Sequence, residues 1–129
     1  MHASSTILVV DDEPLVRDVA CAILKRHGYR VLTVASGKAA VAAMRENGAE
    51  IDLILLDPGI TVPEPRLLVR SLLAMNPDTV IVISSGYLCE YSLLQFDPGS
   101  IAGYVQKPYT AARLRDGVGS VLRSWRTAA

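Results

Sequence analysis

The stretch IDLILLDPGI, Ile51 to Ile60, decides the fold of this chain. Large aliphatic residues fill positions 53–56, which is typical of a strand buried on both faces of a parallel sheet. The strand ends on the carboxylate of Asp57, followed at once by Pro58 and Gly59. A buried carboxylate is costly unless a cation or several donors meet it. Asp57 therefore either marks where the strand reaches solvent, as turn residues commonly do, or belongs to a site.

Around this stretch, apolar strand-like runs alternate with segments of helical period. The predicted strands are 6–10, 30–34, 53–57, 80–84 and 103–106, and the predicted helices are 14–27, 36–47, 65–75, 88–96 and 111–125. In the first helix, apolar residues recur at offsets of 0, 3, 4, 7 and 8 from Val16, a stripe suited to packing on a sheet. Strict alternation of aliphatic strands and helices predicts an α/β fold, a doubly wound parallel sheet with helices on both faces.

Composition restricts the functions to consider. The chain has 129 residues, which predicts one domain over 1–129. Its 13 Lys and Arg residues balance its 13 Asp and Glu residues without forming a basic run, so no nucleic-acid partner is expected. No apolar stretch approaches the roughly 20 residues that cross a bilayer, and the start lacks signal-peptide features, so we expect a cytoplasmic protein without a membrane partner. Cys21 and Cys89 show no disulfide or zinc pattern.

The polar residues that follow the predicted strands are the candidates for a site, because parallel sheets bind ligands at the carboxyl ends of their strands. The first strand is followed by Asp11 and Asp12, the third ends on Asp57, the fourth is followed by Ser85 and the fifth by Lys107. Three carboxylates at one edge would repel one another and invite a hard divalent cation with oxygen ligands. The pattern predicts a Mg²⁺ site.

Each of these residues also has a simpler structural explanation. Asp11 or Asp12 could cap the helix that begins at Pro14, Ser85 could belong to a turn, and Lys107 could be an exposed charge. Four independent polar placements at one sheet edge are hard to obtain from turns alone. Their coincidence favours a functional site.

Four motifs, ILVVDDEP, DLILLD, VISSGY and GYVQKPY, resemble in their order and spacing the receiver domain of two-component response regulators. The resemblance extends from Ser5 to about Arg123 and implies a flavodoxin-like (βα)₅ fold with strand order 2-1-3-4-5. It also implies a phosphorelay function. A histidine kinase or phosphotransfer protein would pass a phosphoryl group to the domain, which would then signal to a downstream protein target. The chain would be a switch rather than a metabolic enzyme.

The resemblance also implies residue roles. Asp57 is expected to be the phosphoacceptor, with Asp11, Asp12, Asp57 and the backbone carbonyl of Gly59 binding Mg²⁺. Ser85 and Lys107 are expected to contact the phosphoryl group. Tyr104 matches the family's aromatic switch position. The fourth helix, fifth strand and fifth helix would form the responsive face and a candidate homodimer surface. Lys107-Pro108 matches a peptide bond that is usually cis in the family.

The loop after Asp57 departs from the family pattern. Receivers usually carry a Met-Pro pair three and four residues beyond the phosphoacceptor and Gly at plus eight, where this chain has Ile60, Thr61 and Pro65. Residues that help place hydrolytic water in the family are here Gly59 and Tyr87, which implies slow loss of the phosphoryl group.

The altered loop motivates a second hypothesis, a receiver-like interaction module that is never phosphorylated, although retention of the site residues argues against it. A third, a haloacid dehalogenase type phosphatase, rests on a faint similarity of LLDPGIT to the DxDxT motif. Gly59 stands where that motif requires its second Asp. The output stays open, because the chain would fit either a single-domain regulator or a receiver cut from a hybrid histidine kinase.

Overall fold

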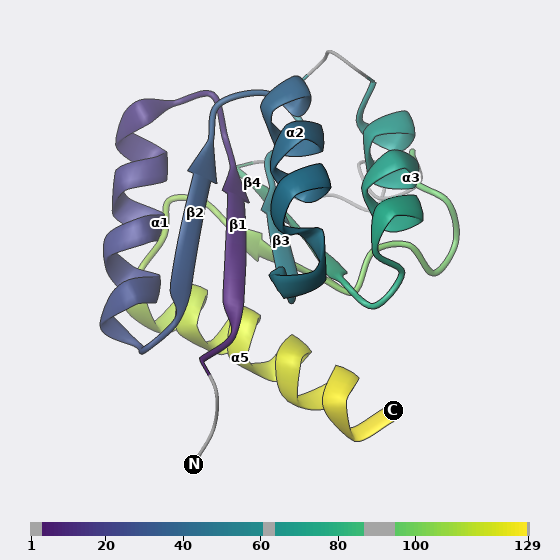
Figure 1. Cartoon of the computed structure of the whole chain (residues 1–129). Coiled ribbons are helices and arrows are strands. Elements are labelled where there is room, and N and C mark those ends of the chain that lie inside the picture. The colour runs from purple at the N-terminus through teal and green to yellow at the C-terminus, as the bar shows by residue number, and fades with distance from the viewer. Residues whose placement is uncertain (1–3, 61–63, 87–94, 129) are drawn as a thin grey trace.

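The computed structural model describes residues 4–60, 64–86 and 95–128 and has a parallel five-stranded sheet at its centre (Figure 1). The strands are β1 Thr6–Val10, β2 Arg30–Val34, β3 Leu53–Leu56, β4 Val80–Ser85 and β5 Gly103–Gln106. The helices are α1 Pro14–Arg26, α2 Gly37–Asn47, the short 3₁₀ helix η1 Gly48–Glu50, α3 Pro65–Met75 and α5 Ala111–Ala128. The spatial order is β2-β1-β3-β4-β5, with every neighbouring pair parallel, which confirms the predicted fold and topology.

Four predicted helices differ in extent from those observed. The first ends at Arg26 rather than at residue 27, and the second begins at Gly37, because Ser36 is its N-cap residue. The last helix runs to Ala128, beyond the apolar stripe from which its end was predicted. Of the helix predicted at 88–96, residues 88–94 lie outside the described residues. Gln95 and Phe96 belong to a turn and a bend, so the predicted C-terminal end of this helix is wrong.

The helices form two layers, with α1 and α5 on one face of the sheet and α2 and α3 on the other (Figure 1). Because successive strand residues point to opposite faces, each central strand contributes to both cores. In β1, Ile7 and Val9 join the core with α1 and α5, whereas Leu8 and Val10 join the core with α2 and α3. This double burial explains why the central strands β1, β3 and β4 are mostly aliphatic.

Individual residues determine where the helices end and how closely they pack on the sheet. The Ala39 amide donates to Ser36 Oγ at 3.0 Å, so Ser36 caps α2 as predicted. Gly28 follows α1 with φ of 90°, a left-handed conformation that favours glycine. In α5, a Cβ at Gly117 would lie 2.6 Å from Val105 Cγ2, so only glycine lets this helix approach β5 so closely.

The order of the strands creates a switch point between β1 and β3, where the chain leaves in opposite directions toward the two edges. The sheet hydrogen bonding continues one residue past these strands. The Asp57 amide donates to the Val10 carbonyl at 3.0 Å, and the Asp11 amide donates to the Val34 carbonyl at 3.2 Å. The residues that follow β1 and β3 are therefore held side by side at the carboxyl edge.

Candidate functional site

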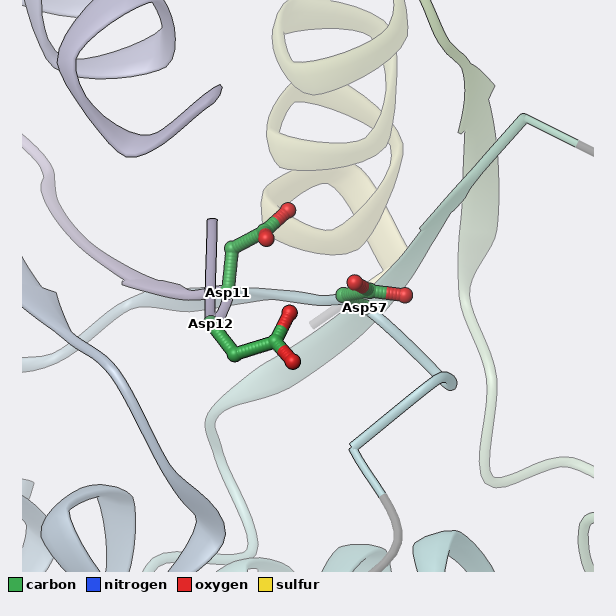
Figure 2. A group of neighbouring side chains, drawn as sticks. All are labelled: Asp11, Asp12 and Asp57. Carbon is green, nitrogen blue, oxygen red and sulfur yellow. The ribbon is translucent and has the colours of Figure 1, made fainter. Parts of the chain in front are cut away.

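Three carboxylates meet at this switch point. Asp11 and Asp12 follow β1 and Asp57 follows β3, and Figure 2 shows their side chains close together at the strand ends. One carboxylate oxygen from each lies within 4.8 Å of the others. Asp11 is only 1% exposed, Asp57 is partly exposed and Asp12 is exposed. The site is therefore buried on one side and open to solvent on the other.

Among the described residues, Lys107 is the cationic residue whose ammonium contacts these carboxylates. It follows β5, and its Nζ donates to Asp11 Oδ2 at 2.6 Å and lies 3.3 Å from Asp57 Oδ2. Burial lowers the pKa of this ammonium, but the hydrogen bond to Asp11 and the charges of Asp57 and Asp11 outweigh burial and raise the pKa above its ordinary value. Lys107 is thus held charged. With all three carboxylates ionised, three negative charges face one positive charge, which leaves a net charge of −2.

Backbone donors orient two of the carboxylates. The Glu13 amide donates to Asp11 Oδ1 and the Gly59 amide donates to Asp57 Oδ1, both at 2.9 Å. A Cβ at Gly59 would lie 3.2 Å from Asp57 Oδ1, so the chain passes very close to this carboxylate. Asp11 does not cap α1, because Glu13 is the N-cap residue and no side chain makes a capping hydrogen bond there. The capping explanation of Asp11 and Asp12 is therefore wrong.

The donor set fits a hard divalent cation. Its chemistry is three carboxylates with excess negative charge at a partly open edge, and such cations prefer oxygen ligands. Asp11, Asp12 and Asp57 are the residues that would hold Mg²⁺. The structure therefore brings together the three carboxylates of the predicted metal site, and the carbonyl of Gly59 stays a predicted ligand.

Ser85 and Tyr104 lie on the two strands beyond β3. Ser85 ends β4 and is partly exposed, and its carbonyl accepts the Lys107 amide at 2.9 Å. Tyr104 lies in β5, where it pairs with Ile83 of β4, and it is 55% exposed. Because Val105 faces the core with α1 and α5, Tyr104 faces the opposite side of the sheet. Lys107-Pro108 is cis, as the resemblance implied.

Sequence reasoning missed a pair of hydroxyls near this edge. Ser84, at 1% exposure, is hydrogen-bonded through its hydroxyl to the hydroxyl of Tyr109. Burial raises the pKa of Tyr109, although the bond to Ser84 and the charge of Lys107 act in the opposite direction. A serine at a buried strand position and an aromatic residue after Lys107-Pro108 were the available signals, but their pairing depends on strand register.

A groove of about 520 Å³ adjoins the site on the side of α1. Its lining residues are Glu13, Leu15, Val16, Val19, Gly86, Lys107, Pro108 and Tyr109. Leu15 is 79% exposed and Val19 is 45% exposed, so this groove offers apolar surface beside the carboxylates.

Fold and site together define a doubly wound α/β protein with an acidic, lysine-containing pocket at the switch point of its sheet. The chain belongs to the response regulator receiver domain family, whose model matches residues 7–118. It is a receiver domain of two-component signalling with a flavodoxin-like fold. No helix among the described residues is long and apolar enough to span a membrane.

Curated relatives agree with this family. Sensor kinase CckA of Brucella abortus is 30% identical over 122 residues, which cover 95% of this chain and 13% of that protein. Sensory transduction protein RegX3 of Mycolicibacterium smegmatis is 28% identical over 120 residues, which cover 92% of this chain and 51% of that protein. The chain thus spans about half of one relative and a small part of the other.

Solved structures agree with the fold. A CheY-like receiver domain protein from Methanospirillum hungatei JF-1 has a TM-score of 0.86 at 20% identity, covering 98% of this chain and 100% of that one. Chemotaxis response regulator CheY4 of Vibrio cholerae has a TM-score of 0.83 at 22% identity, covering 92% and 99%. At these identities the likeness concerns the fold alone.

Proposed function

We propose that this receiver domain accepts a phosphoryl group on Asp57 from a phosphohistidine of a histidine kinase or phosphotransfer protein, with Mg²⁺ as cofactor. The observation that carries the proposal is the environment of Asp57. Its carboxylate is partly exposed, adjoins two further carboxylates and lies 3.3 Å from the Lys107 ammonium. Asp11 is less suited to attack, because it is buried and hydrogen-bonded to Lys107 at 2.6 Å.

The reaction transfers one phosphoryl group between two side chains. An Asp57 oxygen forms a bond to phosphorus while the bond from phosphorus to the donor's imidazole nitrogen breaks, and that electron pair leaves with the imidazole. Lys107 neutralises charge on the phosphoryl oxygens from its place beside Asp57. When bound by Asp11, Asp12 and Asp57, Mg²⁺ supplies further neutralisation and orientation of those oxygens.

In this proposal, Ser85 and Tyr104 carry the conformational change that follows phosphorylation of Asp57. Ser85 at the end of β4 would hydrogen-bond the new phosphoryl oxygens, drawing the following loop inward and leaving room for Tyr104 to turn from its exposed position. This would alter the surface of β5 and α5, which is offered to a downstream protein or to a second copy of the chain. The helix expected between β4 and β5 lies largely outside the described residues.

The phosphoryl donor is expected to approach over the groove beside α1. Exposed Leu15 and Val19 give it apolar surface to bury next to Asp57, and Glu13 adds a charge at the rim. In this role the domain acts on no separate substrate, and its chemistry is limited to its own phosphorylation and dephosphorylation. A cytoplasmic location is part of the same proposal.

The test is labelling of the purified protein by acetyl phosphate with Mg²⁺. We expect one hydroxylamine-sensitive phosphoryl group on the wild type, no label on Asp57→Ala, and strongly reduced label when a chelator is added. Labelling of Asp57→Ala equal to that of the wild type would overturn the assignment. Complete failure of wild-type labelling, together with no NMR response to beryllofluoride and Mg²⁺, would instead favour an unphosphorylated interaction module.

A further inference from the structure

Tyr109 lies two residues beyond Lys107, between β5 and α5, and its hydroxyl is bonded to that of Ser84 in β4. Ser84 is 1% exposed, and the Tyr109 side chain packs against the core that the sheet forms with α1 and α5. The buried hydroxyl of Ser84 would be unfavourable without a hydrogen-bond partner, and the partly buried Tyr109 supplies one. The bond therefore fixes both side chains, and none of the roles assigned above uses it.

The hydroxyl pair joins this part of the chain to β4 in addition to a backbone hydrogen bond. Before Pro108, the Lys107 amide donates to the Ser85 carbonyl at 2.9 Å. After Pro108, the Tyr109 hydroxyl bonds to Ser84. Neighbouring residues of one strand thus hold the backbone on both sides of the Lys107-Pro108 bond. Loss of the hydroxyl pair removes the second polar attachment and leaves the first.

Lys107 depends on the position of this segment, because its single ammonium contacts two carboxylates at once. Nζ reaches Asp11 at 2.6 Å and Asp57 at 3.3 Å, and these two carboxylates follow different strands. A backbone displacement of about 1 Å would change the side-chain geometry that satisfies both contacts together, and misplacements of that size strongly reduce reaction rates.

We infer that the Ser84–Tyr109 hydroxyl pair positions Lys107 for phosphoryl transfer to Asp57. Tyr109 is a positioning residue, because it acts through Lys107 and touches no reacting atom. The inference rests on the proposed function of Asp57. It means that tyrosine and phenylalanine are not equivalent at position 109, although their rings fill the same space.

The experiment removes the two hydroxyls one at a time and together, in Tyr109→Phe, Ser84→Ala and the double variant. Thr79→Val is the matched control, because Thr79 is also 1% exposed and donates a buried hydroxyl bond of 2.7 Å to the Ile51 carbonyl. Thr79 precedes β4 at the edge of the sheet opposite the site. Thermal unfolding, the rate of labelling by acetyl phosphate and the NMR signal of the Lys107 ammonium are measured for each protein.

We expect Tyr109→Phe and Ser84→Ala each to lower the labelling rate about tenfold. The double variant should lose no more than either single variant, because both changes break the same bond. Thr79→Val should lower the unfolding temperature while keeping the wild-type labelling rate. In the unphosphorylated protein, the Lys107 ammonium signal should broaden in Tyr109→Phe and stay sharp in Thr79→Val.

Labelling rates of Tyr109→Phe and Ser84→Ala within twofold of the wild type would overturn the inference. So would equal slowing by Thr79→Val, which would attribute the effect to stability, or losses that add in the double variant. Failure of the wild type to be labelled, together with no NMR response to beryllofluoride and Mg²⁺, would reject the proposed function. The ammonium signal still tests the positioning role in that case, and an unchanged signal in Tyr109→Phe would reject it.

Discussion

Replacement of Lys107 by methionine tests how the buried cation supports the acidic site. The variant keeps the unbranched side chain up to the position of Cε and removes the charged ammonium. Asp11, which is 1% exposed, then loses its ammonium partner while Asp12 and Asp57 remain beside it. A buried charge left without its partner destabilises a protein far more than the intact pair stabilised it.

The structure allows the size of this effect to be worked out. Loss of one partner from a buried ion pair costs about 3–5 kcal/mol, and the partial exposure of Asp57 favours the lower end, about 3 kcal/mol. For a chain of this length that corresponds to a fall of roughly 10 °C in the unfolding midpoint. Because the pKa of Lys107 is raised, the stabilisation is complete below the ordinary lysine pKa of about 10.4 and is lost as the pH rises through the raised value.

The assay is thermal unfolding at neutral pH in chelator, with Arg70→Met as the matched control. The closest contact of Arg70 with Asp97 is also 2.6 Å, but these side chains are 51% and 35% exposed, against 15% and 1% for Lys107 and Asp11. We expect little change in Arg70→Met, because exposed ion pairs contribute little to stability. Equal midpoints for Lys107→Met and the wild type, or equal losses in the two variants, would refute the reasoning from burial.

Three further predictions concern the metal, the lifetime of the phosphoryl group and a helix cap. Asp12→Asn should weaken Mg²⁺ binding by about tenfold or more without lowering the unfolding midpoint in chelator, measured by calorimetric titration and melting; an unchanged affinity would remove Asp12 from the site. Gly59→Asn, whose Cβ would start 3.2 Å from Asp57 Oδ1, should speed loss of the phosphoryl group by about tenfold to a hundredfold, and an unchanged or slower decay would end the role given to Gly59. Ser36→Ala should cost about 1 kcal/mol in denaturant unfolding, because the Ala39 amide loses its acceptor; an unaltered free energy of unfolding would contradict the cap.

The fold was predictable because its signals are local and repeated. The central strands β1, β3 and β4 are short, mostly aliphatic runs. Because parallel strands present their carboxyl ends at one edge, the sequence predicts that Asp11, Asp57 and Lys107 lie together. The structure places the carboxylates of Asp11 and Asp57 in direct contact with the ammonium of Lys107. The approximate place of the site thus followed from strand ends alone.

Other features depend on tertiary register, which the sequence does not display. Nothing in the neighbouring pair Asp11 and Asp12 shows that the first is buried and the second exposed. The bond between Ser84 and Tyr109 needs β4 and the segment after β5 to be aligned to within one residue. The close packing of α5 on β5 requires Gly117 to lie opposite Val105. Neither the helical period nor the strand period of the sequence specifies this pairing.

The contact between Asp11 and Lys107 joins residues 96 positions apart in the chain. Contacts of such long range form late, because a large loop must close before they stabilise anything. A nascent chain that has been synthesised through β4 has all three carboxylates but still lacks their ammonium. On the proposed function, Asp57 would therefore accept a phosphoryl group only after β5 has joined the sheet. Copies of the chain that are still folding would not yet take part in phosphoryl transfer.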